Sequence, residues 1–98
     1  MKYTTLGKTG LTVSVVGLGG IPIQKTDVGG VISVIDACLA EGINYIDTAR
    51  AYTVSEEYLG AALEGRRDRF VIATKSMART YEAMKADIEK SQIGRAHV

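Results

Sequence analysis

Three side chains in the middle of the sequence could together deliver a proton to a carbonyl oxygen. Asp47 ends the apolar run INYI, Tyr52 follows five residues later, and Lys75 ends the later run FVIAT. A phenol is a weak acid at neutral pH, but a lysine ammonium a few ångströms away stabilises the phenolate and lowers the pKa of the phenol. A carboxylate beside the lysine keeps the ammonium charged and oriented. The trio therefore predicts a general acid that protonates a carbonyl oxygen while hydride reaches the carbon.

This chemistry requires elements that bring the three residues to one place. Apolar segments typical of strands occupy residues 13–20, 43–48 and 69–75, and their starts are about 26 to 30 residues apart, the length of a βαβ unit. In a parallel sheet the carboxyl ends of neighbouring strands meet at one edge, where such folds place their active sites. Asp47 and Lys75 end two of these strands, so we expect the trio to converge there.

Helical patterns separate the expected strands. The first helix has an apolar face made by Val28, Val31, Ile32, Ile35, Cys38 and Leu39. Thr26 or Asp27 can cap its start, and Gly42 can end it in the left-handed conformation that glycine tolerates. Cys38 on this face is interpreted as core packing. As the single cysteine it also rules out an internal disulfide and a cysteine-rich metal site, and no metal site is predicted.

Two further helices follow the same logic. The second is expected from Ser55 to Gly65, with Tyr58, Leu59, Ala62 and Leu63 on its buried face, and the third from Thr80, with Tyr81, Met84 and Ile88 on one side. The charged pairs Glu56-Glu57 and Arg66-Arg67 are interpreted as solvated helix-end charges. Before the first strand, two short β-prone arms flank the tetrapeptide at residues 7–10, so residues 2–14 predict a β-hairpin.

Several stretches resemble one known family in the right order and spacing. LGKTGLTVSVVGLGG, GINYIDTARAY, SEEYLGAAL and RFVIATKS are similar to the N-terminal third of the aldo-keto reductases, a resemblance that covers residues 1–92. GGIPIQ and KSMART resemble a bacterial branch whose members often append an iron–sulphur region. The resemblance implies an α/β fold, the N-terminal fragment of a (β/α)8 TIM barrel with a leading β-hairpin and about three βα units.

The resemblance also implies an activity, the NADPH-dependent reduction of aldehydes or ketones. Asp47, Tyr52 and Lys75 fall on three positions of the family's Asp-Tyr-Lys-His catalytic set. Gly19, Gly20 and Asp47 fall near the expected nicotinamide ribose. The histidine belongs after a fourth strand, and His97 has no strand that could place it there. With three of eight strands and open sheet edges, the 98-residue chain alone is expected to be inactive and marginally folded at best.

Other interpretations of these residues stay open. Asp47 alone could cap a turn, Tyr52 could anchor a loop, and Lys75 could be a surface lysine. The stretch VGLGGIP is similar to a dinucleotide-binding fingerprint, but Pro22 stands where a small residue belongs, and Asp36, the acidic residue about 20 positions on, falls mid-helix. A regulatory or redox-sensing protein on the same barrel would keep the catalytic residues, as potassium-channel β-subunits do.

Bulk properties narrow the remaining classes. The net charge is +1, and Lys and Arg are scattered among Asp and Glu rather than clustered, so no nucleic-acid partner is predicted. No apolar run is long enough to cross a bilayer and no secretory signal is recognisable, so a cytoplasmic location is expected. The resemblance to the aldo-keto reductases implies a small carbonyl substrate. Residues 93–98, IGRAHV, match the translation of a common sequencing adapter, so we expect a non-native tail there and a partial barrel domain at residues 1–92.

Overall fold

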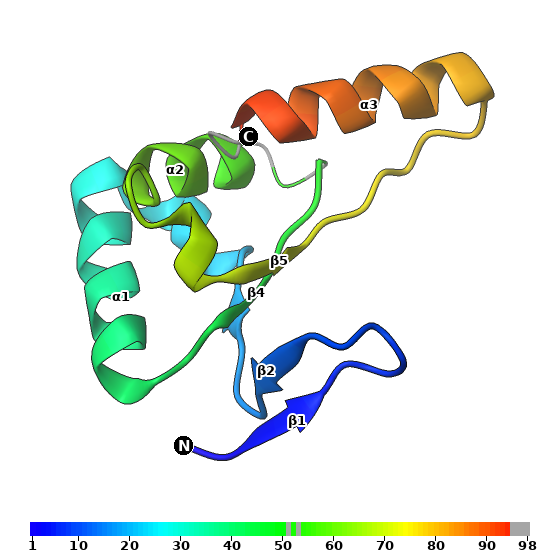
Figure 1. The fold of residues 1–98 in the computed structure, drawn as a ribbon. Helices are drawn as coiled ribbons and strands as arrows, with labels where there is room; N and C mark the ends of the chain where they lie inside the picture. The colour runs from blue at the N-terminus through cyan, green and yellow to red at the C-terminus, as the bar shows by residue number, and fades with distance from the viewer. Residues whose placement is uncertain (51, 53, 95–98) are drawn as a thin grey trace.

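The computed structural model describes residues 1–50, 52 and 54–94 (Figure 1). Within these residues the chain forms a two-stranded antiparallel hairpin and a parallel sheet with the strand order β3-β4-β5. Figure 1 shows the hairpin at one end of the sheet and helices α1 and α2 packed beside it. The α/β architecture with a leading hairpin and successive βα units, expected from the sequence, is confirmed.

The hairpin pairs β1 (Tyr3–Thr5) with β2 (Thr12–Ser14). Its turn contains Gly7 and Gly10, which have φ angles of 54° and 77°, a region that side chains larger than glycine rarely adopt. The hairpin docks at the start of β4, where the Ser14 N–H donates to Asn44 Oδ1 at 2.7 Å and the Asn44 N–H donates to Ser14 Oγ at 3.1 Å. It therefore lies at the end of the sheet opposite the carboxyl ends of the strands.

The parallel strands are β3 (Leu18–Gly19), β4 (Tyr45–Asp47) and β5 (Val71–Ala73). Gly19 is paired with Asp47, and Asp47 with Ala73, so the carboxyl ends of all three lie level. The expected first strand over 13–20 is wrong in its extent. Residues 13 and 14 belong to the hairpin, and only Leu18–Gly19 pairs with β4, because the start of that segment pairs with β1 instead.

Helix α1 (Val28–Glu41) follows a 3-10 turn, η1 (Pro22–Lys25). Asp27 caps α1 by accepting a hydrogen bond from the Gly30 N–H at 2.8 Å, and Gly42 ends it with φ 79°, as predicted. The buried face of α1 is narrower than the predicted apolar face, because Ile32, predicted to lie on that face, is 38% exposed.

Helix α2 (Ser55–Ala62) leads through η2 (Arg67–Arg69) into β5, and α3 (Tyr81–Gly94) follows a long connection. Thr80 precedes α3 as predicted, and its Oγ1 accepts a hydrogen bond from the Ala83 N–H at 3.1 Å. Of the expected tail, residues 93 and 94 continue α3, and residues 95–98, His97 among them, lie outside the described residues.

The core lies between one face of the sheet and helices α1 and α2. It is formed by the buried side chains of Ile23, Val31, Ile35, Cys38, Ile46, Leu59, Ala62, Leu63 and Phe70. Burial raises the pKa of the Cys38 thiol, as expected for a cysteine that serves packing. None of the helices in the described part of the chain is long and apolar enough to span a bilayer.

Candidate active site

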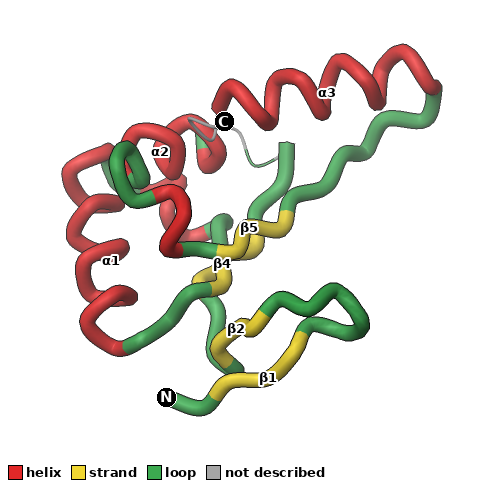
Figure 2. Tube along the Cα trace, in the orientation of Figure 1, coloured by secondary structure: helices red, strands yellow, loops and turns green. Residues whose placement is uncertain are grey.

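Strand alternation divides β4 between the core and the open face of the sheet. Ile46 is fully buried beneath the helices, whereas its neighbours Tyr45 and Asp47 line a groove on the opposite face. Hydrogen bonds continue past the strand ends, since the Thr48 N–H donates to Ala73 O at 2.8 Å and the Arg50 N–H to Lys75 O at 2.9 Å. Figure 2 shows these strands running side by side into their loops. The pairing brings Lys75 to the level of the loop that follows Asp47.

Lys75 and Asp47 form an ion pair at this edge. Lys75 Nζ lies 3.1 Å from Asp47 Oδ1 and 3.3 Å from Oδ2, and it donates to the Thr48 carbonyl oxygen at 2.8 Å. The side chains of Lys75 and Asp47 are 51% and 52% exposed, so both are held in place yet accessible to a ligand.

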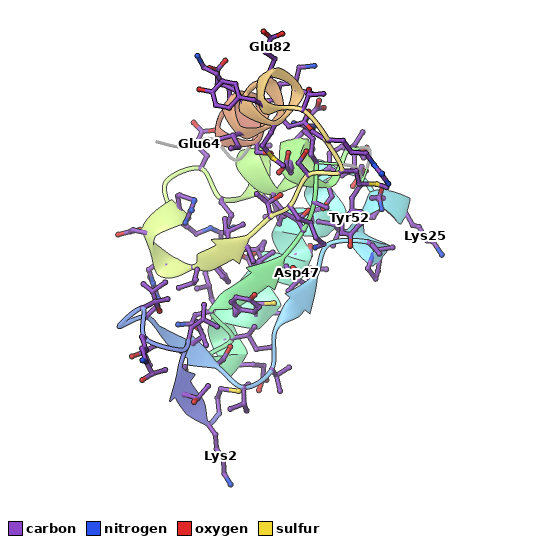
Figure 3. The ribbon with its side chains drawn as sticks, turned by 90° about the vertical axis from the view of Figure 1, so that its right-hand side faces the viewer. Lys2, Lys25, Asp47, Tyr52, Glu64 and Glu82 are labelled. Carbon is purple, nitrogen blue, oxygen red and sulfur yellow. The ribbon has the colours of Figure 1, made fainter. Side chains whose placement is uncertain are left out.

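Tyr52 completes the group from the loop after β4. The Lys75 ammonium lies 5.1 Å from the centroid of the Tyr52 ring. The positions of Asp47 and Tyr52 can be followed in Figure 3, where both are labelled. Two backbone hydrogen bonds hold Tyr52 itself, one from the Tyr52 N–H to Ala49 O at 3.1 Å and one from the Ser55 N–H to Tyr52 O at 2.7 Å. The structure thus brings together the three residues that strand register alone had placed at one edge.

The charge state of Lys75 follows from these contacts. Partial burial lowers the pKa of Lys75, but the hydrogen bond and charge of Asp47, followed by those of Tyr52, outweigh it, and the pKa is raised above its ordinary value. Lys75 is therefore a cation throughout the physiological pH range, with a phenol and a carboxylate beside it.

The two glycines after β3 play different parts. Gly19 is exposed next to Asp47, and a side-chain carbon built on it would meet nothing nearer than Pro22 Cδ at 4.0 Å. Gly20 is buried, and its N–H donates to Asp47 O at 2.7 Å. Gly19 therefore leaves space where a ligand could approach Asp47, and Gly20 lets β3 pack closely against the end of β4.

A groove of about 470 Å³ runs along the open face from the hairpin to Gly19 and Asp47. This volume is in the range of small-molecule sites, about 300–1,000 Å³. Among the residues described by the structure, no group of three or more His, Cys, Asp or Glu side chains could hold a metal ion.

The prediction that Glu56 is a solvated helix-end charge is wrong. Its side chain is fully buried and lies 2.9 Å from Arg50 Nη1, and its Oε2 accepts a hydrogen bond from Thr74 Oγ1 at 2.6 Å. Helical periodicity offered a usable signal, since Glu56 lies three residues before the buried Leu59. Glu57 is exposed as expected.

The prediction that Arg66 is a solvated helix-end charge is also wrong. Its guanidinium pairs with Asp36 in the middle of α1 and donates to Ala62 O at 3.0 Å, so it links the two helices. With Asp36 committed to this pair and α1 beginning only at Val28, the dinucleotide-fingerprint alternative has no structural support at either of its key positions.

Comparisons with known proteins agree on one family. The family model for the aldo/keto reductase family matches residues 15–96. The chain is similar to the aldo-keto reductase YhdN of Bacillus subtilis, with 42% identity over 85 residues, 78% of this chain and 26% of that protein. It is also similar to a probable voltage-gated potassium channel subunit beta of Arabidopsis thaliana, with 35% identity over 82 residues, 76% of this chain and 25% of that protein.

Solved structures give the same result. An aldo-keto reductase of Bacillus halodurans in its holo form superposes with a TM-score of 0.86 and 32% identity, over 99% of this chain and 37% of that chain. The present chain thus spans about a quarter of the curated relatives' length, and its elements match the hairpin and the first βα units of a TIM barrel.

Proposed function

The chain belongs to the aldo/keto reductase family, and on this premise we propose that the protein reduces aldehydes or ketones to alcohols with NADPH as the hydride donor. The activity is proposed for the full-length protein, because the chain spans only about a quarter of its curated relatives. We further propose that the substrates are small carbonyl compounds and that the reaction takes place in the cytoplasm.

The proposal is supported above all by the position of Lys75. Its ammonium is 3.1 Å from the Asp47 carboxylate and 5.1 Å from the centre of the Tyr52 ring. A phenol gives up its proton more readily when a cation can stabilise the phenolate, and a carboxylate beside the cation prevents its deprotonation.

In the proposed reaction Tyr52 is the general acid. Its hydroxyl would donate a proton to the carbonyl oxygen as that oxygen gains negative charge. NADPH, when bound, would supply hydride to the carbonyl carbon, so that the C=O double bond becomes the C–O single bond of the alcohol. The product is an alcohol, and the phenolate that remains is stabilised by Lys75 until it takes a proton from water.

In this proposal the carboxyl edge of the sheet would hold the nicotinamide cofactor through Asp47 and the two glycines after β3. Asp47 presents a half-exposed carboxylate beside Gly19, which has no side chain to fill the space. Asp47 would accept hydrogen bonds from ribose hydroxyls, and Gly19 would allow close approach. Gly20 would contribute by shape, because its N–H is bonded to Asp47 O.

The test is a comparison of Tyr52→Phe with wild type in the full-length protein, using NADPH oxidation with a small aldehyde. We expect kcat to fall by about 10²–10⁴-fold, the usual contribution of a general acid, with NADPH affinity unchanged. Tyr81→Phe is the matched control, because Tyr81 is 81% exposed on α3. Retention of wild-type kcat by Tyr52→Phe would refute the proposed role.

A second candidate is a regulatory or redox-sensing protein on the same barrel. It is favoured by the 35% identity to the potassium channel subunit beta. A protein of this kind would bind NADPH but reduce aldehydes slowly or not at all. Wild-type turnover that disappears in Tyr52→Phe distinguishes the enzyme from it.

A further inference from the structure

The most unusual charge in the described structure is the carboxylate of Glu56, fully buried in the first turn of α2. A buried carboxylate is costly unless charges or hydrogen bonds compensate it. Arg50 lies at 2.9 Å from Oε1, and Thr74 Oγ1 donates to Oε2 at 2.6 Å. Glu56 therefore has a partner on each oxygen, and neither partner belongs to its own helix.

These partners come from the two segments that carry the candidate catalytic residues. Arg50 is two residues before Tyr52, and Thr74 directly precedes Lys75. The same segments are joined by the bond from the Arg50 N–H to Lys75 O at 2.9 Å. Glu56 thus contacts both segments, the one before Tyr52 through Arg50 and the one before Lys75 through Thr74.

We propose that Glu56 is a positioning residue that holds the Tyr52 loop and the Lys75 strand end in the register required for proton transfer. The inference rests on the proposed reductase function and deepens it. Misplacement of a reacting group by about 1 Å can lower a rate by about 10²-fold, so a rigid link between the two supports has a direct consequence for turnover.

The negative charge of Glu56 is the essential feature. Within the described residues no N–H group is aligned on Oε1, although Arg50 Nη1 is 2.9 Å away, so the contact is an ion pair rather than a directed hydrogen bond. Because the Arg50 side chain is only 19% exposed, water can only partly replace the Glu56 carboxylate as the partner of its guanidinium. A glutamine at position 56 would still accept from Thr74 but would release Arg50.

The test uses the full-length protein and compares Glu56→Gln with Glu57→Gln. Both substitutions remove one negative charge from the same helical turn, but Glu57 is exposed. We expect Glu56→Gln to lower kcat at least tenfold with the KM for NADPH within about twofold of wild type, and Glu57→Gln to change neither. Arg50→Met should also lower kcat. The double variant should have a kcat no lower than that of the more impaired single variant, because each single substitution already removes the same ion pair.

A second variant and a second readout keep the test decisive. Thr74→Val preserves the shape of the side chain but removes the hydroxyl that donates to Glu56, so it too should lower kcat. It replaces Glu56→Gln as the test if Glu56→Gln does not fold. By NMR, Glu56→Gln should return the raised pKa of Lys75 toward its ordinary value, because a shift of the Lys75 strand end, as proposed, would lengthen the 3.1 Å contact between Lys75 Nζ and Asp47 Oδ1. If the wild type shows no turnover, the proposed function fails, and this titration alone decides the role of Glu56. If folded Glu56→Gln keeps the wild-type kcat, the proposed role of Glu56 is overturned. If the wild type is inactive, an unchanged Lys75 titration in folded Glu56→Gln overturns that role instead.

Discussion

A single methyl group at Gly20 should destabilise the protein, because Gly20 lies directly against the end of β4. A Cβ there would lie 2.7 Å from Ser55 Oγ, 2.8 Å from Thr48 Oγ1 and 2.9 Å from Asp47 O. The Gly20 N–H also donates to Asp47 O, so the backbone cannot withdraw without losing that bond. The Gly20→Ala substitution must therefore displace the two hydroxyl side chains.

The cost has several parts. Overpacking a filled site costs about 1–3 kcal/mol. Thr48 and Ser55 are fully buried and bond each other at 2.7 Å, and separating them leaves hydroxyls unpaired at about 1–3 kcal/mol. Alanine also has less conformational freedom than glycine in the unfolded chain, which offsets about 0.4–1 kcal/mol of this loss of stability. Together these parts predict that the free energy of unfolding falls by about 1–6 kcal/mol, with a central value of about 3 kcal/mol.

Urea unfolding of the full-length protein, followed by circular dichroism, measures this loss. Gly19→Ala is the matched control, because its Cβ would meet only Pro22 Cδ, at an ordinary van der Waals distance of 4.0 Å, and it should change stability by less than about 0.5 kcal/mol. Adding Ser55→Ala removes the closest atom, so the double variant should cost less than the two single costs combined by about 1 kcal/mol. Equal stabilities of Gly20→Ala and Gly19→Ala would refute the steric argument.

Two further predictions concern charge and core packing. The pKa of Lys75 is raised in the folded state, so the stabilisation from its pair with Asp47 is complete below the unfolded pKa, near 10.4, and is lost as pH rises through the folded pKa. Asp47→Asn should lower the Lys75 pKa in an NMR titration, and an unchanged titration would contradict the pairing. Leu59→Ala should cost about 2–5 kcal/mol in urea unfolding, because Leu59 is fully buried, whereas Ile32→Ala, at a site 38% exposed, should cost less than about 1 kcal/mol. Similar losses for the two would show that α2 is not packed as described.

Local patterns were sufficient for most of the framework. The hairpin, the parallel strands and the Gly42 ending of α1 were all predictable, and the cap of α1 was predictable to within two residues, Thr26 or Asp27. Turn residues, capping residues and apolar spacing act over a few neighbours. The convergence of Asp47 and Lys75 was predictable too, because parallel strands align their carboxyl ends. The extent of β3 was not, because the preceding residues had a competing partner in β1.

Only the tertiary structure decided which charges are buried and which glycine lacks room. Glu56 and Glu57 are adjacent and chemically identical, yet only Glu56 faces Arg50 and Thr74. Gly19 and Gly20 are likewise adjacent, yet only Gly20 meets other atoms at close range. The sequence by itself determined the elements and the edge where Asp47 and Lys75 meet. The partners of each side chain depended on segments distant in the chain, because burial is a property of how elements pack and not of the residue that is buried.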